Sequence, residues 1–149
     1  MTTAESVPHL IFLLGKQYYA LPITQVIEVA AMVELTQTPN TNREFLGVAN
    51  RHGAVLPILD LRPVFRQSTP RIDISTLFVV ATTGEREVGL IVDEVLQIEH
   101  FSADQIAHRQ SSHERHIQGI VSHNQRLIQV IALSNLLAQF LPQAYPEVE

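Results

Sequence analysis

Short apolar runs separated by turn-forming residues make up most of this sequence. Leu10–Leu14 and Tyr18–Leu21 flank Gly15–Gln17, an arrangement that predicts a β-hairpin. The runs are too short for helices of ordinary length and are rich in β-branched residues, which favours strands. Three further pairs of runs predict hairpins in the same way: Gly47–Ala49 with Ala54–Leu59, Leu77–Ala81 with Val88–Val92, and Ile117–Val121 with Leu127–Ile131. We therefore expect a mainly β (all-β) protein.

Helical signals are few. Ser134 is a candidate N-cap for a last helix over Asn135–Leu141, which Pro142 would end. Short helices are also predicted after Asp60 and after Ser102, and an N-cap is the simplest structural role for Asp60. Helices are therefore expected only as short connections between strands and near the C-terminal end.

A weak internal repeat relates the two halves of the chain. Under a shift of about 69 residues the matching pairs are Gly15 and Gly84, Leu21 and Leu90, Val26 and Val95, and Val29 and Ile98. Under a shift of about 72 residues they are Gly47 and Gly119, Val48 and Ile120, Leu56 and Ile128, Leu61 and Leu133, and Val64 and Leu136. The repeat predicts two similar β units of roughly 70 residues, each marginal alone, that pack as two small barrels with a groove between them. Six apolar positions with strand-like spacing are expected to face the two cores: Leu56, Ile58, Leu90, Val92, Ile128 and Val130.

The two copies share their core positions but not their charged positions. The first copy carries Asn50–Gly53 and Asp60–Arg62, whereas the second has Ser122–Gln125 and Ala132–Ser134. Core packing needs apolar residues in both copies, but a specific contact with another molecule needs its polar residues in only one. Residues that are polar in one copy alone are therefore the better functional candidates.

Length and composition indicate one soluble domain. The chain has 149 residues, of which 46% are hydrophobic and 17% charged, enough to bury a core without a disulfide or a metal. We expect one domain over residues 9–141, with loose termini at 1–8 and 142–149. Neither a signal peptide nor an apolar run of the roughly 18 residues that span a membrane is visible, so we expect a cytoplasmic protein without membrane insertion.

Charge and cysteine content exclude several classes of function. Lys and Arg number 10 against 15 Asp and Glu, a formal charge of −5, and the scattered basic residues argue against a nucleic-acid partner. The chain has no cysteine, which excludes disulfide scaffolds, cysteine-ligated zinc, iron–sulfur clusters and thiol nucleophiles. It also lacks G-x-S-x-G, P-loop and G-x-G-x-x-G motifs, so we assign no catalytic residue and no cofactor.

Five of the seven histidines fall within a 24-residue stretch, which raises the question of a metal site. They are His100, His108, His113, His116 and His123. His113 and His116 stand three apart, whereas the H-E-x-x-H pattern of zinc hydrolases places its histidines four apart. The surrounding segment is polar, so we expect solvated histidines and no physiological metal.

Several stretches in unbroken order, from about His9 to Leu141, carry a family resemblance. They are Tyr19–Ile23 with Val26–Val29, Thr38–Asn40 before Phe45–Asn50, Gly53–Arg62, and Val88–Val95. These stretches resemble the CheW-like family, the adaptor domains that couple chemoreceptors to a sensor histidine kinase in bacterial chemotaxis-type systems. The family fold is two small SH3-like five-stranded β barrels in pseudo-twofold relation, which agrees with the internal repeat.

The resemblance implies a non-enzymatic adaptor. Family members bind the regulatory domain of a histidine kinase, itself CheW-like, and the cytoplasmic tip of a chemoreceptor, whose helix lies along the groove between the barrels. Val26 and Glu28 match family positions linked to partner binding, and Gly47 matches a glycine in the same region. Glu28 is the stronger candidate because its counterpart in the second copy is the neutral Gln97.

One motif departs from the family pattern. The family usually has Asn, an aliphatic residue, Arg and Gly where this chain has Asn50, Arg51, His52 and Gly53. An arginine one position earlier is expected to point to the opposite side of a strand or tight turn. Either His52 serves a diverged partner, or the turn is re-registered and Arg51 substitutes for the usual arginine. The candidate partner-binding residues are Val26, Glu28, Gly47, Arg51, His52 and Arg62.

Simpler roles compete with partner binding at several of these positions. Gly47 is expected to meet a backbone need, either a positive φ or a close approach of strands. A solvated surface charge is the alternative for Arg62, and a core position is the alternative for Val26, because Val95 takes its place in the second copy. For the whole protein the second interpretation is a ligand-binding regulatory β domain with a small molecule in the inter-barrel groove. An esterase-like or metal-dependent enzyme is the third and least favoured interpretation.

Overall fold

Twelve strands and a few short helical segments make up the part of the chain that the computed structural model describes, residues 5–69, 71–108 and 115–142. In chain order they are β1 (Ser6–Leu14), β2 (Gln17–Pro22), the 3₁₀ turn η1 (Ile23–Gln25), β3 (Val26–Ala31), β4 (Leu35–Thr36), β5 (Phe45–Arg51), β6 (Ala54–Asp60), α1 (Leu61–Val64), β7 (Leu77–Thr82), β8 (Glu87–Val92), β9 (Glu94–Ser102), the 3₁₀ turn η2 (Ala103–Gln105), β10 (Ala107–His108), β11 (Ile117–His123), β12 (Arg126–Ile131) and α2 (Leu133–Phe140). The predicted mainly β class is confirmed.

All four predicted hairpins are present. β1 with β2, β5 with β6, β7 with β8, and β11 with β12 pair as antiparallel strands. Each connecting turn contains a residue at positive φ, namely Gly15, Gly53, Gly84 and Asn124 respectively. The local turn chemistry therefore predicted correctly which neighbouring runs pair.

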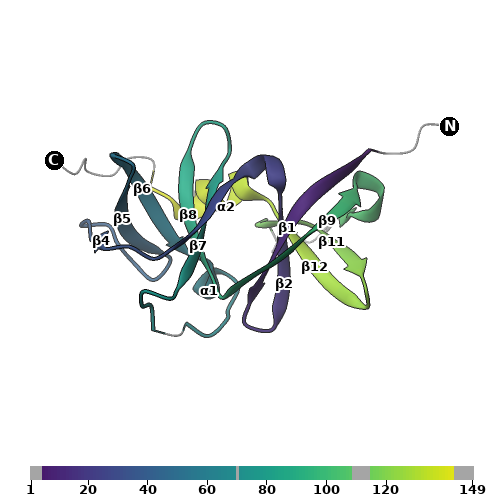
Figure 1. The fold of residues 1–149 in the computed structure, drawn as a ribbon, viewed down its shortest axis with the longest axis horizontal. Helices are drawn as coiled ribbons and strands as arrows, with labels where there is room; N and C mark the ends of the chain where they lie inside the picture. Colours follow the sequence, from purple (N-terminus) through teal and green to yellow (C-terminus); the bar gives the residue numbers. More distant parts are fainter. Residues whose placement is uncertain (1–4, 70, 109–114, 143–149) are drawn as a thin grey trace.

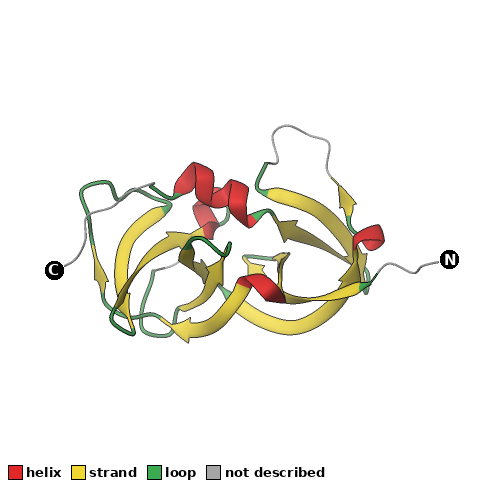
Figure 2. Cartoon of the chain, turned by 90° about the horizontal axis from the view of Figure 1, so that it is seen from above, coloured by secondary structure: helices red, strands yellow, loops and turns green. Residues whose placement is uncertain are grey.

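The strands form two sheets with the same strand order. Barrel A has the order β10-β11-β12-β2-β1-β9, and barrel B, taken from its other edge, has the order β4-β5-β6-β8-β7-β3. Each sheet curls into a small barrel (Figure 2) with five strands of six or more residues and one two-residue strand, β10 or β4. The predicted pair of SH3-like five-stranded barrels in pseudo-twofold relation is confirmed.

The two barrels exchange strands, which the repeat alone did not predict. Barrel A takes β1 and β2 from the beginning of the chain and β9–β12 from its end, while β3–β8 form barrel B. In Figure 1 the purple β1 and β2 accordingly lie beside the green and yellow-green β9, β11 and β12. In the parallel pair β12–β2, Val130 lies opposite Ala20, and in the parallel pair β6–β8, Ile58 lies opposite Gly89. Val130 is the repeat counterpart of Ile58 and Gly89 that of Ala20, so the two pairs have the same register. The repeat is therefore structural, but neither barrel is one contiguous half of the chain.

Three apolar clusters stabilise this arrangement, not the two that were expected. The largest is shared by both barrels and includes Phe12, Leu14, Tyr19, Leu21, Phe45, Leu59, Val79, Leu90, Val92, Leu133, Leu136 and Leu137. A second cluster belongs to barrel A and includes Ile11, Phe101, Val121, Ile128 and Val130. The third belongs to barrel B and includes Ala49, Leu56, Ile58, Phe78, Val80 and Ile91. All six predicted core residues are buried, with Leu90 and Val92 in the shared cluster.

The two α-helices begin at equivalent points of the repeat, with different caps. Asp60 is the N-cap of α1, as predicted, and its carboxylate accepts a hydrogen bond from the backbone N–H of Arg62 at 3.0 Å. The prediction for Ser134 was wrong, because α2 begins at Leu133 and Ala132 occupies its N-cap without a side-chain hydrogen bond. Ala132 is the repeat counterpart of Asp60, so the boundary follows the duplicated fold. Figure 2 shows α2 over the junction between the two barrels.

The N-terminal strand begins earlier than expected. β1 starts at Ser6, which pairs with Ser102 of β9, so residues 6–8 belong to the sheet and not to a loose terminus. Residues 1–4 and 143–149, also expected to be loose, lie outside the described part of the chain. Within the described ranges no helix is long and apolar enough to cross a membrane.

Candidate functional site

The motif that departs from the family pattern forms a two-residue hairpin turn. Arg51 pairs with Ala54, and the two residues between them, His52 and Gly53, have φ values of 52° and 82°. Positive φ at both central positions is the requirement of a type I′ turn, and histidine is among the residues that tolerate it. The side-chain oxygen of Asn50 accepts a hydrogen bond from the backbone N–H of Gly53 at 3.0 Å, which stabilises the turn.

Arg51 connects this turn to two other strands of barrel B. Its Nε donates to Oε1 of Glu28 on β3 at 2.8 Å, and its Nη1 lies 3.6 Å from Oε1 of Glu87, at the start of β8. The hydrogen bond from Arg51 lowers the pKa of the Glu28 carboxyl below its usual value. Glu28 is thus held as an anion at the surface.

His52 stands at the tip of the turn, with 77% of its side chain exposed. Its Nε2 lies 3.9 Å from the same Oε1 of Glu28 that Arg51 contacts. The expectation that Arg51 points to the opposite side is wrong, because the tight turn brings both side chains toward one carboxylate. We call Glu28, Arg51, His52 and Glu87 the Glu28 cluster.

Two exposed apolar side chains lie on the same strand as Glu28. Exposure alternates along the strand, with Val26 and Glu28 half-buried and Ile27 and Val29 exposed at 42% and 41%. Val26 packs against the shared central core, so the structure gives it a core contact, and its role in partner binding stays a prediction. Ile27 and Val29 were not among the predicted site residues, although the period-2 alternation of the strand places them on the face opposite Val26 and Glu28.

Gly47 has a backbone role that explains its identity. Its φ is 128°, and a Cβ at this position would overlap the backbone carbonyl oxygen of Thr36 on the neighbouring β4. Both observations match the structural role expected for this glycine. Gly47 lies outside the Glu28 cluster, and a direct contact with a partner stays a prediction.

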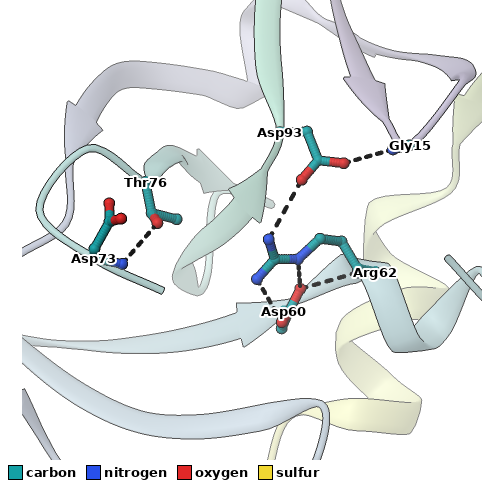
Figure 3. Close-up of polar contacts among 6 residues, drawn as sticks. All are labelled: Gly15, Asp60, Arg62, Asp73, Thr76 and Asp93. Carbon is teal, nitrogen blue, oxygen red and sulfur yellow. Dashed lines mark hydrogen bonds and ion pairs between the residues drawn. The ribbon is translucent and has the colours of Figure 1, made fainter. Parts of the chain in front are cut away.

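Arg62 is buried, and the alternative of a solvated charge is wrong. Only 3% of the residue is exposed, and its guanidinium forms a fork on Asp60, with Nε to Oδ1 at 2.9 Å and Nη2 to Oδ2 at 3.0 Å (Figure 3). Its Nη1 also donates to Oδ1 of Asp93 at 3.3 Å. Burial lowers the pKa of Arg62, but the hydrogen bonds and charges of the two carboxylates more than offset this, so the pKa is raised overall.

Asp93 extends these contacts across the boundary between the barrels. It lies between β8 of barrel B and β9 of barrel A, and its other carboxylate oxygen accepts a hydrogen bond from the backbone N–H of Gly15 in the β1–β2 turn (Figure 3). The backbone N–H of Asp93 also donates to the carbonyl of Leu13 at 3.0 Å. We call Asp60, Arg62, Asp93 and the Gly15 amide the inter-barrel network. The sequence signal for Asp93 was available, because its repeat counterpart is the uncharged Thr24.

The histidine-rich stretch is only partly described. Nε2 of His123 lies 3.3 Å from Oε2 of Glu99, and the ring of His116 packs edge-on against Phe140. His113 and the side chain of His108 lie outside the described residues. Among the described side chains, no group of three or more His, Cys, Asp or Glu residues is placed to hold a metal ion.

A polar cavity of about 630 Å³ lies between the barrels, beside α1 and α2. Four glutamines line it, Gln17 and Gln129 from barrel A and Gln67 and Gln139 from the segments after β6 and β12. Nε2 of Gln129 donates to Oε1 of Gln17 at 2.9 Å, so part of the lining is already hydrogen-bonded. The predicted groove between the barrels stays a prediction, for which this cavity is the candidate.

Comparisons with known proteins agree with this architecture. Residues 8–140 match the CheW-like domain family. The chain is 37% identical over 97 residues to the chemotaxis protein CheW of Klebsiella aerogenes, covering 65% of this chain and 58% of that protein. It is 26% identical over 129 residues to the chemotaxis protein CheW of Helicobacter pylori, covering 85% of this chain and 78% of that protein.

A solved structure has the same fold. The crystal structure of the scaffolding protein TtCheW from Thermoanaerobacter tengcongensis superposes with a TM-score of 0.78 at 23% identity, covering 85% of this chain and 89% of that one. The duplicated strand order, the two barrels and the family match over residues 8–140 lead to one conclusion. This chain belongs to the CheW-like family of chemotaxis adaptors.

Proposed function

We propose that this protein is a non-enzymatic cytoplasmic scaffold that couples chemoreceptors to a sensor histidine kinase. The observation that carries the proposal is the surface-exposed Glu28 cluster. Its neighbours Ile27 and Val29 add exposed apolar side chains on the other face of β3, which is an edge strand. Protein-binding surfaces commonly combine an apolar centre with charged groups that set orientation and association rate. The regulatory domain of the kinase is the partner proposed for this face.

The charges of the cluster suggest how it would select a partner. Arg51 neutralises part of the Glu28 charge, while Glu87 remains more than half exposed and His52 projects from the tip. A partner that places a cation near Glu87 and wraps the edge of β3, so that apolar side chains cover Ile27 and Val29, would satisfy both groups. Removing the charge of Glu28 would free Arg51 and disturb the cluster without opening the core.

Isothermal titration with the kinase regulatory domain and with a receptor-tip peptide tests this proposal. Glu28→Lys reverses a charge at the centre of the face, and Glu94→Lys reverses an exposed charge at the start of β9 in the other barrel as a matched control. We expect Glu28→Lys to weaken binding of the kinase domain by about tenfold or more and the control to leave it unchanged. Equal affinities for both variants and the wild type would exclude this face.

His52→Arg addresses the departure from the family motif. A guanidinium offers a fixed fork of five donors, whereas a neutral imidazole offers one. If the partner resembles those of other family members, His52→Arg should keep or strengthen kinase binding. Weaker binding would instead indicate a diverged partner that fits the smaller, more exposed imidazole.

A second candidate function rests on the polar cavity between the barrels. A cavity of about 630 Å³ lined by glutamines has the size of a small-molecule site, which would make the protein a ligand-binding regulatory β domain. The two functions separate in the titration, since a scaffold needs no small molecule to bind the kinase domain. Kinase binding that appears only after addition of a cell metabolite extract would favour the second function.

A further inference from the structure

An apolar pocket lies just beyond the C-terminal end of β3. Its volume is about 430 Å³, and its apolar lining consists of Met32, Val33, Leu35, Ile72 and Ile74. Met32, Leu35 and Ile72 are half-buried and pack against the barrel B core, so the floor of the pocket is fixed by the fold. Val33 and Ile74 form its exposed rim, at 49% and 88%.

A hydrogen-bonded turn holds Ile74 in this exposed position. The backbone N–H of Asp73 donates to Oγ1 of Thr76 at 3.0 Å (Figure 3), and Oδ1 of Asp73 accepts the backbone N–H of Ser75 at 2.8 Å. The carbonyl of Thr76 accepts the N–H of Met32 at 2.8 Å, which ties the turn to the end of β3. The backbone that carries Ile74 is thus fixed by these hydrogen bonds, so docking costs little additional backbone entropy.

An exposed fraction of 88%, as at Ile74, is unusual for isoleucine. Large exposed apolar residues that border a pocket mark interaction surfaces more often than isolated apolar residues do. Val33 follows β3 in the chain, and Ile27 and Val29 on that strand are also exposed.

The charges at the rim define the chemistry of the partner. Glu34 and Asp73 are exposed and line the pocket, and its described lining contains no basic side chain. Hydrogen bonds from Ser75 lower the pKa of the Asp73 carboxyl, which therefore remains an anion at neutral pH. A second copy of this chain, with a formal charge of −5, would bring the same carboxylates together. Charge complementarity therefore favours a basic partner over self-association.

We propose that this pocket docks an amphipathic segment of another protein, in which a large apolar side chain enters the pocket between flanking Lys or Arg residues. The apolar side chain would pack against Ile72 and Ile74, and the basic residues would lie beside Glu34 and Asp73. The site is separate from the Glu28 cluster and does not depend on the function proposed for it. Helix-in-groove recognition by spaced apolar anchors is the corresponding binding mode.

A synthetic peptide tests the proposal directly. The probe is an amphipathic helical peptide of about 14 residues with leucines three and four residues apart and lysines on both sides of the leucine stripe. A second peptide has the same leucines with glutamates in place of the lysines. The full-length chain is titrated with each peptide by isothermal calorimetry, as the wild type, as Ile74→Asp and as Leu127→Asp. The last variant is the matched control, because Leu127 is 65% exposed on β12 of the other barrel.

We expect the lysine peptide to bind the wild type and Leu127→Asp alike and Ile74→Asp about tenfold or more weakly. The added carboxylate of Ile74→Asp would attract lysine, so weaker binding isolates the lost apolar contact. The glutamate peptide should bind more weakly than the lysine peptide. Absence of binding, equal binding to Ile74→Asp, or equal binding of the two peptides would overturn the proposal, as would a wild-type dimer in sedimentation that Ile74→Asp abolishes.

Discussion

The inter-barrel network leads to a quantitative prediction about stability. Arg62→Met removes the guanidinium but keeps much of the side-chain volume. Asp60, which is 3% exposed, loses its two hydrogen bonds from the guanidinium, and Asp93 loses its single one. Removing one partner of a buried ion pair costs about 3–5 kcal/mol, because the remaining charge stays buried without compensation. The backbone N–H of residue 62 still donates to Asp60, so we expect a loss near the lower end of this range.

A second substitution in the same network should cost less. Asp93→Asn keeps an oxygen that accepts the Gly15 N–H but removes the charge that Arg62 contacts at 3.3 Å. Arg62 retains its fork on Asp60, and the Asp93 side chain is 26% exposed, so water screens part of the interaction. We expect a loss of about 1 kcal/mol. Glu94→Gln, at the exposed neighbouring position, should change stability by less than about 0.5 kcal/mol.

Urea unfolding at neutral pH measures all three variants and the double variant of Arg62 and Asp93. The double-mutant cycle isolates the Arg62–Asp93 interaction, provided that the m-value stays constant. The expected order of cost is Arg62→Met, then Asp93→Asn, then Glu94→Gln. If Arg62→Met costs less than about 1 kcal/mol in an unchanged fold, the network contributes no more than an exposed ion pair, and the reasoning from burial is refuted.

The remaining predictions concern packing, backbone geometry, pH and metal. Leu90→Ala empties a site in the shared core and should lower the unfolding free energy by about 2–5 kcal/mol in urea titrations, whereas an unchanged midpoint would contradict the shared core. Gly47→Ala would force a Cβ toward the Thr36 carbonyl, so we expect a loss of about 1–3 kcal/mol in thermal melts followed by circular dichroism. Burial lowers the pKa of His9 from its ordinary value of 6.5, against the raising effect of its hydrogen bond to Val7, so the unfolded chain binds more protons near pH 6. The stability contributed by neutral His9 is thus fully present above pH 6.5 and is lost as the pH falls below that value. In urea titrations over this pH range, His9→Gln should reduce the fall in unfolding free energy with decreasing pH. Zinc or a chelator should leave the melting temperature unchanged, since a specific site would add roughly 2.7 kcal/mol at a hundredfold excess over its dissociation constant.

Local signals predicted the hairpins, but not which barrel each hairpin joins. The turn at Gly15–Gln17 specifies that β1 pairs with β2, because both strands lie within a few residues of it. The parallel pairing of β2 with β12 joins residues more than a hundred positions apart, such as Ala20 and Val130, and depends on packing that a sequence pattern does not encode. The repeat therefore predicted the two barrels correctly, but the expectation that each barrel is one continuous half of the chain was wrong.

The candidate site shows a similar division between local and non-local information. The asymmetry between the copies selected Glu28 and Arg51 as candidates, and the structure places them in contact, while their role in partner binding stays a prediction. The same asymmetry selected Arg62, but its burial depends on Asp93, which comes from a distant segment and reaches it only in the folded chain. The type I′ geometry that turns His52 toward Glu28 also needed the observed φ values, because histidine is an uncommon residue at that position.

Strand exchange makes the network cross the barrel boundary, and the sequence difference between the copies confines it to one end. Gly15 and Arg62 belong to the same sequence copy, but the exchange places the β1–β2 turn in barrel A and α1 beside barrel B, so their contact crosses the boundary. In the second copy the corresponding turn, between β7 and β8, faces α2, where Ser134 replaces Arg62. A cavity of about 410 Å³ remains there, bordered by Ser134 and Leu137. One end of the boundary is thus joined by an ion network around the buried pair Asp60 and Arg62, and the other by the apolar face of α2 and a hydrogen bond from Nη2 of Arg86 to the carbonyl of Pro142.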